Sequence, residues 1–147
     1  MYQHTQLGWA IWGILAWIAS FVGVAWVLTG PNLGVIGFMA LLVLMAILFG
    51  TLTVKIADDR ISWWFGPGIL KKSLSLAELQ SVRAVSNSWS HGIGIRITHD
   101  GWVYGVSGFQ AVELVVDEEQ RYRVGTDEAE ALLAAIQTAM DANKGTA

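Results

Sequence analysis

The chain lacks cysteine altogether, and its first 54 residues lack charged side chains. The absence of cysteine excludes disulfides, thiolate nucleophiles and thiolate metal ligands. No Asp, Glu, Lys or Arg precedes Lys55, so the 9 basic and 12 acidic residues all lie between Lys55 and Lys144. The net charge of -3 therefore belongs to the second part of the chain, and it argues against a broad nucleic-acid-binding surface.

The uncharged part contains two apolar runs, 7–28 and 33–54, which the sequence predicts to be transmembrane helices. As a helix each run is about 33 Å long, enough to cross a hydrocarbon core of about 30 Å. Residues 29–32 (TGPN) between the runs are typical of a tight turn. We therefore expect an antiparallel transmembrane hairpin over residues 1–54, with both chain termini on one side of the membrane.

The positions of the basic residues predict the orientation of this hairpin. Lys55, Arg60, Lys71 and Lys72 closely follow the second run, whereas the turn between the runs has no basic residue. Lys and Arg are retained preferentially on the cytoplasmic side of a membrane. The sequence therefore predicts a multi-pass protein of the bacterial inner membrane with cytoplasmic N- and C-termini.

Four tryptophans in the first run are candidate membrane or partner contacts. Trp9 and Trp12 lie near the start of the predicted helix and Trp26 near its end, where indole rings prefer the headgroup region. Trp17 lies in the middle, where its N–H has no water, so it either reaches a neighbouring carbonyl or packs in a protein contact. We interpret Trp17 as the first candidate for a partner-facing residue.

After Gly50 the pattern changes to short strand-like runs separated by turn residues, which is typical of an antiparallel sheet. The predicted strands are 51–56, 60–65, 69–76, 78–85, 93–98, 111–116 and 121–125. An amphipathic helix is expected to begin at Asp127. The sequence thus predicts one mainly-β domain over residues 55–142, followed by a short tail at 143–147.

Several segments of this domain resemble a known family. They are Trp89 with 92–96 (GIGIR), 101–102 (GW), 105–108 (GVSG), 111–114 (AVEL), 125–127 (GTD) and 129–132 (AEAL). Together with the order of strands and helix, they are similar to the bacterial PH-like (pleckstrin-homology-like) membrane proteins, small chains with a transmembrane hairpin and a cytoplasmic domain. The resemblance implies a PH-like barrel with one C-terminal helix, and it carries over no catalytic residue.

Recognition of phosphoinositides is disfavoured by the local charge. In the lipid-binding members of the PH superfamily, basic residues surround the loop between the first two strands, but here that loop holds Asp58 and Asp59. Two carboxylates repel a phosphate, and Lys55 with Arg60 only offset them. Lys71 and Lys72 remain candidates for contact with anionic headgroups, or alternatively for protection of a strand edge.

The sequence shows no constellation typical of an enzyme. His91, His99 and Asp100 fit no metal-ligand spacing, because the strand between the two histidines would hold them about 20 Å apart. No nucleophile elbow or phosphate loop is present, and the glycines at 92 and 94 lack a third. We therefore expect no catalytic residue, metal or cofactor.

Two adjacent tryptophans, Trp63 and Trp64, pose the question of what covers them. Neighbouring strand residues point to opposite faces, so one indole can enter the core while the other lies outside. The cover would be the bilayer interface, a second copy or another membrane subunit. The rings of Trp89 and Trp102 would need a cover in the same way. For all four tryptophans the alternative is that the ring packs within the chain itself.

These observations predict a non-enzymatic, membrane-anchored protein-interaction or assembly module at the cytoplasmic face. The alternative is an accessory structural subunit of a larger energy-transducing or transport complex, in which the first helix packs against other subunits, lipids or pigments. In both cases the expected partners are membrane lipids together with another protein or a second copy. The two differ in one observable: a subunit co-purifies with its complex at fixed stoichiometry.

Overall fold

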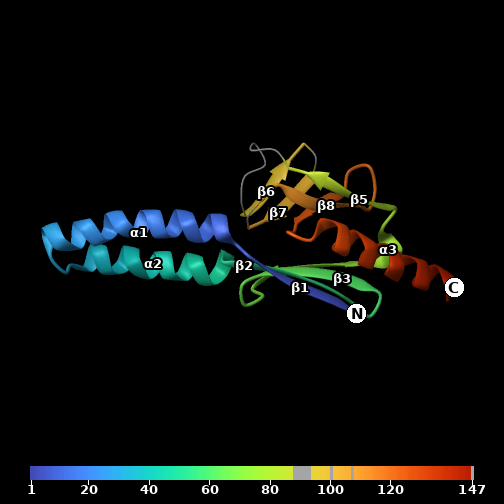
Figure 1. Ribbon diagram of the computed structural model, residues 1–147, viewed down its shortest axis with the longest axis horizontal. Coiled ribbons are helices and arrows are strands. Elements are labelled where there is room, and N and C mark those ends of the chain that lie inside the picture. The colour runs from blue at the N-terminus through green and yellow to red at the C-terminus, as the bar shows by residue number, and fades with distance from the viewer. Residues whose placement is uncertain (88–93, 100, 107, 147) are drawn as a thin grey trace.

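A pair of helices projects from a β domain in the computed structural model, and both chain termini lie in the β domain (Figure 1). The structure describes residues 1–87, 94–99, 101–106 and 108–146. The elements are β1 (Tyr2–Leu7), α1 (Trp9–Thr29), α2 (Leu33–Phe49), β2 (Thr51–Ala57), β3 (Arg60–Phe65), β4 (Leu70–Ser75), a 3-10 turn η1 (Leu76–Glu78), β5 (Ser81–Ser86), β6 (Gly94–Thr98), β7 (Gly101–Gly105), β8 (Gln110–Val115), β9 (Arg121–Gly125) and α3 (Ala129–Gly145).

The predicted helical hairpin is present, but its two helices differ in length. With 21 residues, α1 is long and apolar enough to cross a membrane, and only 6% of its most apolar stretch is buried. In contrast, α2 has 17 residues, about 26 Å, and falls short of that length. The prediction of a second transmembrane helix over 33–54 is therefore wrong in extent, because the helix ends at Phe49.

The chain switches from helix to strand at Gly50, inside the predicted second helix. From Thr51 to Ala57 the chain forms β2, with Leu52, Val54 and Ile56 in the core. The β-branched residues Thr51, Thr53 and Val54 favour a strand over a helix. Hydropathy alone does not show this boundary, because the apolar run continues through it.

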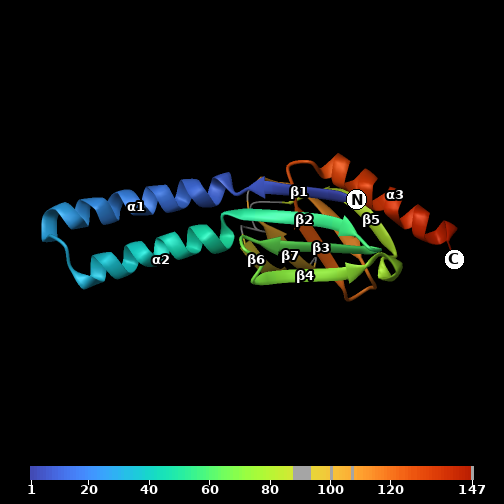
Figure 2. The same ribbon diagram turned by 90° about the horizontal axis from the view of Figure 1, so that it is seen from below.

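The N-terminal residues form a strand that the sequence analysis did not predict. Strand β1 pairs antiparallel with β2 from Tyr2 opposite Ile56 to Leu7 opposite Thr51. The helical pair is thus an insertion between two neighbouring strands of one sheet, whose order is β1-β2-β3-β4 (Figure 2). The segments before α1 and after α2 consequently lie at the same end of the hairpin, as the short turn predicts.

The second sheet has the order β5-β8-β9-β7-β6. Strand β7, which was also not predicted, pairs antiparallel with β6 and parallel with β9. The predicted strand at 78–85 begins later than expected, since Leu76–Glu78 forms a 3-10 turn whose capping box joins Ser75 and Glu78. The sheets therefore contain four and five strands among the described residues, rather than seven in total.

Both sheets and α3 share one hydrophobic core. Strands β2 and β3 contribute Leu52, Ile61 and Trp63, strand β8 contributes Leu114, and α3 contributes Ile136, each at most 1% exposed. The alternation of apolar and polar residues along each strand places one face of each sheet in this core. The architecture is therefore mainly β with one C-terminal helix, as the sequence predicts.

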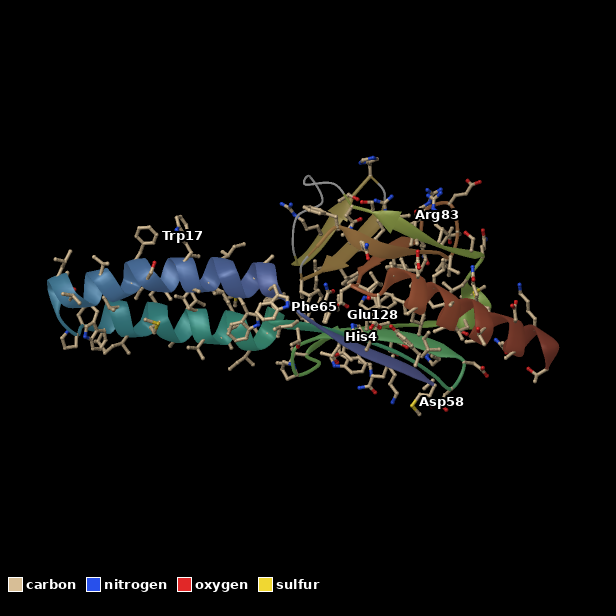
Figure 3. All side chains as sticks on the ribbon, viewed as in Figure 1. His4, Trp17, Asp58, Phe65, Arg83 and Glu128 are labelled. Carbon is tan, nitrogen blue, oxygen red and sulfur yellow. The ribbon has the colours of Figure 1, made fainter. Side chains whose placement is uncertain are left out.

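The tight turn predicted between β2 and β3 is confirmed. Asp58 and Asp59 both have positive φ, 54° and 58°, as a two-residue turn of the mirror-image type requires. Asp tolerates this conformation better than most residues. Asp58 lies at the end of the domain remote from the helices (Figure 3).

Candidate functional site

The helical pair presents a large apolar surface that no described part of the chain covers. Trp17, at 66% exposure, points away from α2, and its ring meets that of Phe21 edge-on at 4.9 Å (Figure 3). Other large apolar side chains at least 40% exposed on the two helices are Trp9, Trp12, Ile14, Val24, Trp26, Val27, Leu28, Leu33, Ile36, Phe38, Leu41, Val43, Leu44 and Ile47. An apolar patch of this extent on a folded protein marks an interaction with a membrane or with protein.

An apolar hollow of about 430 Å³ lies between α1 and α2, in the half of the pair near the connecting turn. Its walls are apolar side chains of both helices, among them Ile18, Phe21, Val22 and Phe38. No charged residue occurs on either helix. A hollow of this kind fits hydrocarbon, such as an acyl chain or the side chains of a further helix.

A glycine-based neck joins the helical pair to the β domain. Gly8 donates its N–H to the carbonyl oxygen of Gly50 at 2.8 Å, and Trp12 Nε1 donates to the same oxygen at 3.2 Å. Trp12 therefore holds the two helix bases together as well as facing outward at 44% exposure. Trp9 is 73% exposed beside this neck, where an interfacial anchor is expected.

The turn between β3 and β4 packs beneath the end of α2. Gly66 approaches α2 so closely that a Cβ atom would lie 2.1 Å from the carbonyl oxygen of Ile47. Ile69, in the same turn, and Leu70, the first residue of β4, are 74% and 39% exposed. The end of the domain nearest the helices thus presents apolar side chains of its own.

The adjacent tryptophans have different environments, as strand alternation predicts. Trp63 is 1% exposed and packs against the rings of Tyr104 and Tyr122, so the prediction of a partner or membrane contact for Trp63 is wrong. Its indole nitrogen, Nε1, is also buried and has no hydrogen-bond partner within the described chain. Trp64 is half-buried, with Lys71 Nζ 5.3 Å from its ring centroid.

Lys72 is directed differently from Lys71. Its Nζ lies 5.4 Å from the ring centroid of Tyr122, a geometry typical of a cation–π contact. Both lysines belong to β4, which is an edge strand of its sheet. Both predicted roles therefore fit these positions. The lysines can protect the strand edge because β4 is an edge strand, and they can contact lipid headgroups because β4 begins beside the end of α2.

A polar seam connects β1 to the start of α3. His4 Nε2 lies 2.6 Å from Asp127 Oδ1, and His4 Nδ1 lies 3.4 Å from Glu128 Oε2. Tyr2 Oη donates to Glu128 Oε2 at 3.3 Å. These contacts join the N-terminal strand to the C-terminal helix, and no feature of the isolated segments predicts them.

Tyr2 gives the seam a pH dependence. Burial, reinforced by the Glu128 carboxylate, raises the pKa of Tyr2 from 10.0 to about 12. Folding therefore favours the neutral phenol, so its contribution is complete below pH 10 and is lost as the pH rises to 12. We expect the thermal midpoint to fall less between pH 9 and pH 11.5 in Tyr2→Phe than in the wild type. Tyr104→Phe leaves the seam intact and is the control. In this variant the part of the fall in thermal midpoint that depends on Tyr2 should remain.

The outer face of the second sheet carries a buried carboxylate surrounded by arginines. Glu113 Oε2 lies 2.7 Å from Arg83 Nε and 4.0 Å from Arg123 Nη2, and Glu113 Oε1 lies 4.0 Å from Arg121 Nη1. The register across β5, β8 and β9 places Arg83, Glu113 and Arg123 in one row. The sequence analysis did not identify this cluster.

The remaining predicted polar residues form no site among the described residues. His91, Asp100 and Trp89 lie outside the described residues, and His99 is exposed at the end of β6. Among the residues that the structure describes, no group of three metal-ligating side chains comes together. Trp102 is 40% exposed and stacks on Tyr104, so its ring is partly covered by the chain itself.

Comparisons with protein-family models, with curated proteins and with solved structures find no match to this chain.

Proposed function

We propose that this chain is a non-enzymatic membrane protein whose helical pair anchors the β domain at the cytoplasmic face of a bacterial inner membrane. The domain serves there as a PH-like module for protein interaction or assembly. One observation carries the proposal: two uncharged helices project from the domain with their large apolar side chains exposed. Insertion into a bilayer would remove this apolar surface from water, and it would bury no charged side chain because the helices carry none.

The ends of the hairpin support this placement. Trp9 and Trp12 lie at the base of the helical pair and Trp26 near its far end, 14 residues beyond Trp12, so the indoles mark two levels. At 17 residues, α2 is by itself shorter than the hydrocarbon core, and the neighbouring Ile69 and Leu70 extend the apolar zone at its base. Both helices would therefore span, with the base of the domain in the headgroup region.

The basic residues support the cytoplasmic orientation. Lys55, Lys71 and Lys72 lie in the domain just beyond the helices, whereas the turn at 30–32 carries no charge. Each lysine near an anionic surface contributes about 1 kcal/mol, which would orient the domain without selecting a particular lipid. The Asp58–Asp59 turn lies at the opposite end, so it also gives no support to phosphoinositide binding.

The lack of native cysteine makes a direct test of topology possible. We expect Pro31→Cys, in the turn between the helices, to react with a membrane-impermeant maleimide in intact spheroplasts. We expect Asp58→Cys, in the β2–β3 turn, to react only after permeabilisation. The wild-type chain provides the unlabelled background.

Other labelling patterns would overturn parts of the proposal. Labelling of Asp58→Cys but not Pro31→Cys in intact spheroplasts would reverse the orientation. Recovery of the wild type in the soluble fraction after alkaline carbonate extraction would refute membrane anchoring altogether. Equal labelling of both variants before permeabilisation would show that the hairpin does not span.

A second candidate function is that of an accessory structural subunit of a larger integral-membrane complex. The exposed Trp17–Phe21 pair favours it, because an indole at mid-membrane depth is better placed against protein than against acyl chains. On this interpretation, Trp17→Leu reduces the recovery of a stoichiometric companion after gentle detergent extraction, while Trp26→Leu leaves it unchanged. Recovery of the chain alone from wild-type membranes would exclude the subunit role.

A further inference from the structure

A groove runs along the β domain from the base of the helices to the side of α3. One hollow, of about 550 Å³, begins at Leu7 and Trp9, and a second, of about 590 Å³, continues between β5 and the first turn of α3. The two hollows share Ser86, Gln110 and Asp127, so they form one continuous groove. The groove therefore opens where α1 leaves the domain.

One wall of the groove is the open edge of a sheet. Strand β5 pairs only with β8 in the described sheet, and Ala84, Val85 and Ser86 line the groove. The N–H of Asn87 donates to the carbonyl oxygen of Phe109, the residue before β8, so alternation directs the backbone groups of Ser86, Ala84 and Val82 away from β8. An edge of this kind is a template for another extended chain.

The acidic side chains of the groove gather in its second hollow, at the start of α3. Asp127, Glu128 and Glu130 line this hollow opposite β5, Asp127 also lines the first hollow, and no Lys or Arg is among the described residues that line the two hollows. His4 contacts both Asp127 and Glu128, whereas Glu130, in the first turn of α3, is exposed. An extended segment in this groove is therefore favoured if it carries positive charge.

We propose that the β5 edge and this groove bind an extended, Lys- or Arg-rich juxtamembrane segment of another membrane protein by strand addition. This inference rests on the proposed function, since it places the mouth of the groove at the cytoplasmic membrane surface. Segments that leave transmembrane helices on that side are enriched in Lys and Arg. Such a segment enters beside Trp9, pairs with β5 and places its cations near Glu130.

The test uses the full chain in nanodiscs of uncharged phosphatidylcholine, so that the probe does not adsorb to the lipid. The probe is a fluorescent ten-residue peptide of alternating Lys and Val, measured by anisotropy. Its controls are the alternating Glu–Val peptide and a Lys–Val peptide whose alternate backbone nitrogens are methylated. We expect only the unmethylated Lys–Val peptide to bind, because strand addition needs backbone donors and the groove selects positive charge.

Two substitutions locate the binding on the protein. Ala84→Pro removes an N–H on the open edge and none that bonds to β8, so the domain folds while affinity falls about ten-fold. Glu130→Gln weakens binding by about two- to five-fold, as the loss of one exposed ion pair predicts. Glu118→Gln, in the exposed β8–β9 turn, is the matched control and leaves affinity unchanged.

Several results would overturn the inference. Equal binding of the methylated peptide would exclude strand addition, and equal binding of the Glu–Val peptide would exclude selection by charge. If folded Ala84→Pro bound the peptide with the same affinity as the wild type, the peptide would bind elsewhere on the protein. If the wild-type chain formed dimers that Ala84→Pro separates, the β5 edge would bind a second copy of this chain. Failure of the chain to enter nanodiscs would instead refute the proposed membrane function, so the two failures are distinguishable.

Discussion

Replacing Glu113 by alanine is expected to destabilise the β domain by about 3–5 kcal/mol, the cost of removing one partner from a buried ion pair. The Glu113 side chain is 1% exposed, and that of Arg123 is 11% exposed. Without the carboxylate, the positive charge of Arg123 remains in a largely dehydrated position with its compensation reduced. The free energy of unfolding is measured by urea denaturation of the full chain in detergent.

Two companion variants test the cause of this effect. Glu118→Ala removes an acid from the exposed β8–β9 turn and is expected to change stability by less than about 0.5 kcal/mol. The double variant Glu113→Leu/Arg123→Met removes both buried charges, so much of the stability should return. A loss below about 1 kcal/mol in Glu113→Ala would show that the arginines do not depend on this carboxylate.

Gly66→Ala is the second substitution with a large expected effect, a loss of about 3 kcal/mol. Gly66 has φ of 48°, which costs an L-residue about 1 kcal/mol or more. The added Cβ would also lie 2.1 Å from the carbonyl oxygen of Ile47 and 3.0 Å from that of Leu48. Since both atoms belong to the backbone of α2, the helix base or the β3–β4 turn must move, adding about 1–3 kcal/mol.

Gly68 supplies a matched control in the same turn. It also has positive φ, 96°, but its Cβ would meet only the Trp64 ring at 3.6 Å, an ordinary contact. Gly68→Ala should therefore cost about 1 kcal/mol, from backbone strain alone. Equal losses of unfolding free energy in the two variants would show that the close approach to α2 contributes nothing. Faster proteolysis at the helix base in Gly66→Ala alone would locate the disturbance.

Local patterns predicted the elements whose signals are contained in a few consecutive residues. The Asp58–Asp59 turn, the alternation of Trp63 and Trp64, and the C-terminal helix were predicted because each depends on neighbouring residues. The switch at Gly50 was missed because a strand buried within an apolar run has the same hydropathy as a helix. The predicted second helix, 33–54, consequently extends beyond Phe49, where α2 ends.

The two missed strands depend on distant partners. Strand β1 is short and mostly polar, and its partner β2 begins 44 residues after Leu7. Strand β7 spans five residues bounded by Gly101 and Gly105, and its parallel partner β9 lies beyond another strand. Their pairing comes from tertiary packing, which local propensity does not represent.

The charged cluster could have been found from strand alternation. Arg83 lies between Val82 and Ala84, Glu113 between Val112 and Leu114, and Arg123 between Tyr122 and Val124. Each charge thus occupies the face opposite the core in its own strand. The local sequence pattern does not reveal the strand register that places these residues in one row. It also does not reveal the edge position of β5, which forms one wall of the groove.

The insertion of the helical pair between β1 and β2 also sets an order of events during synthesis. Strand β1 is synthesised before the two helices, and its partner β2 follows only after both of them. The first sheet cannot begin to include β1 until the hairpin is complete, and the His4 contact must wait for the start of α3. Strand β1 therefore has no partner strand while the two helices are being synthesised, and its contact with the start of α3 is the later of its two attachments.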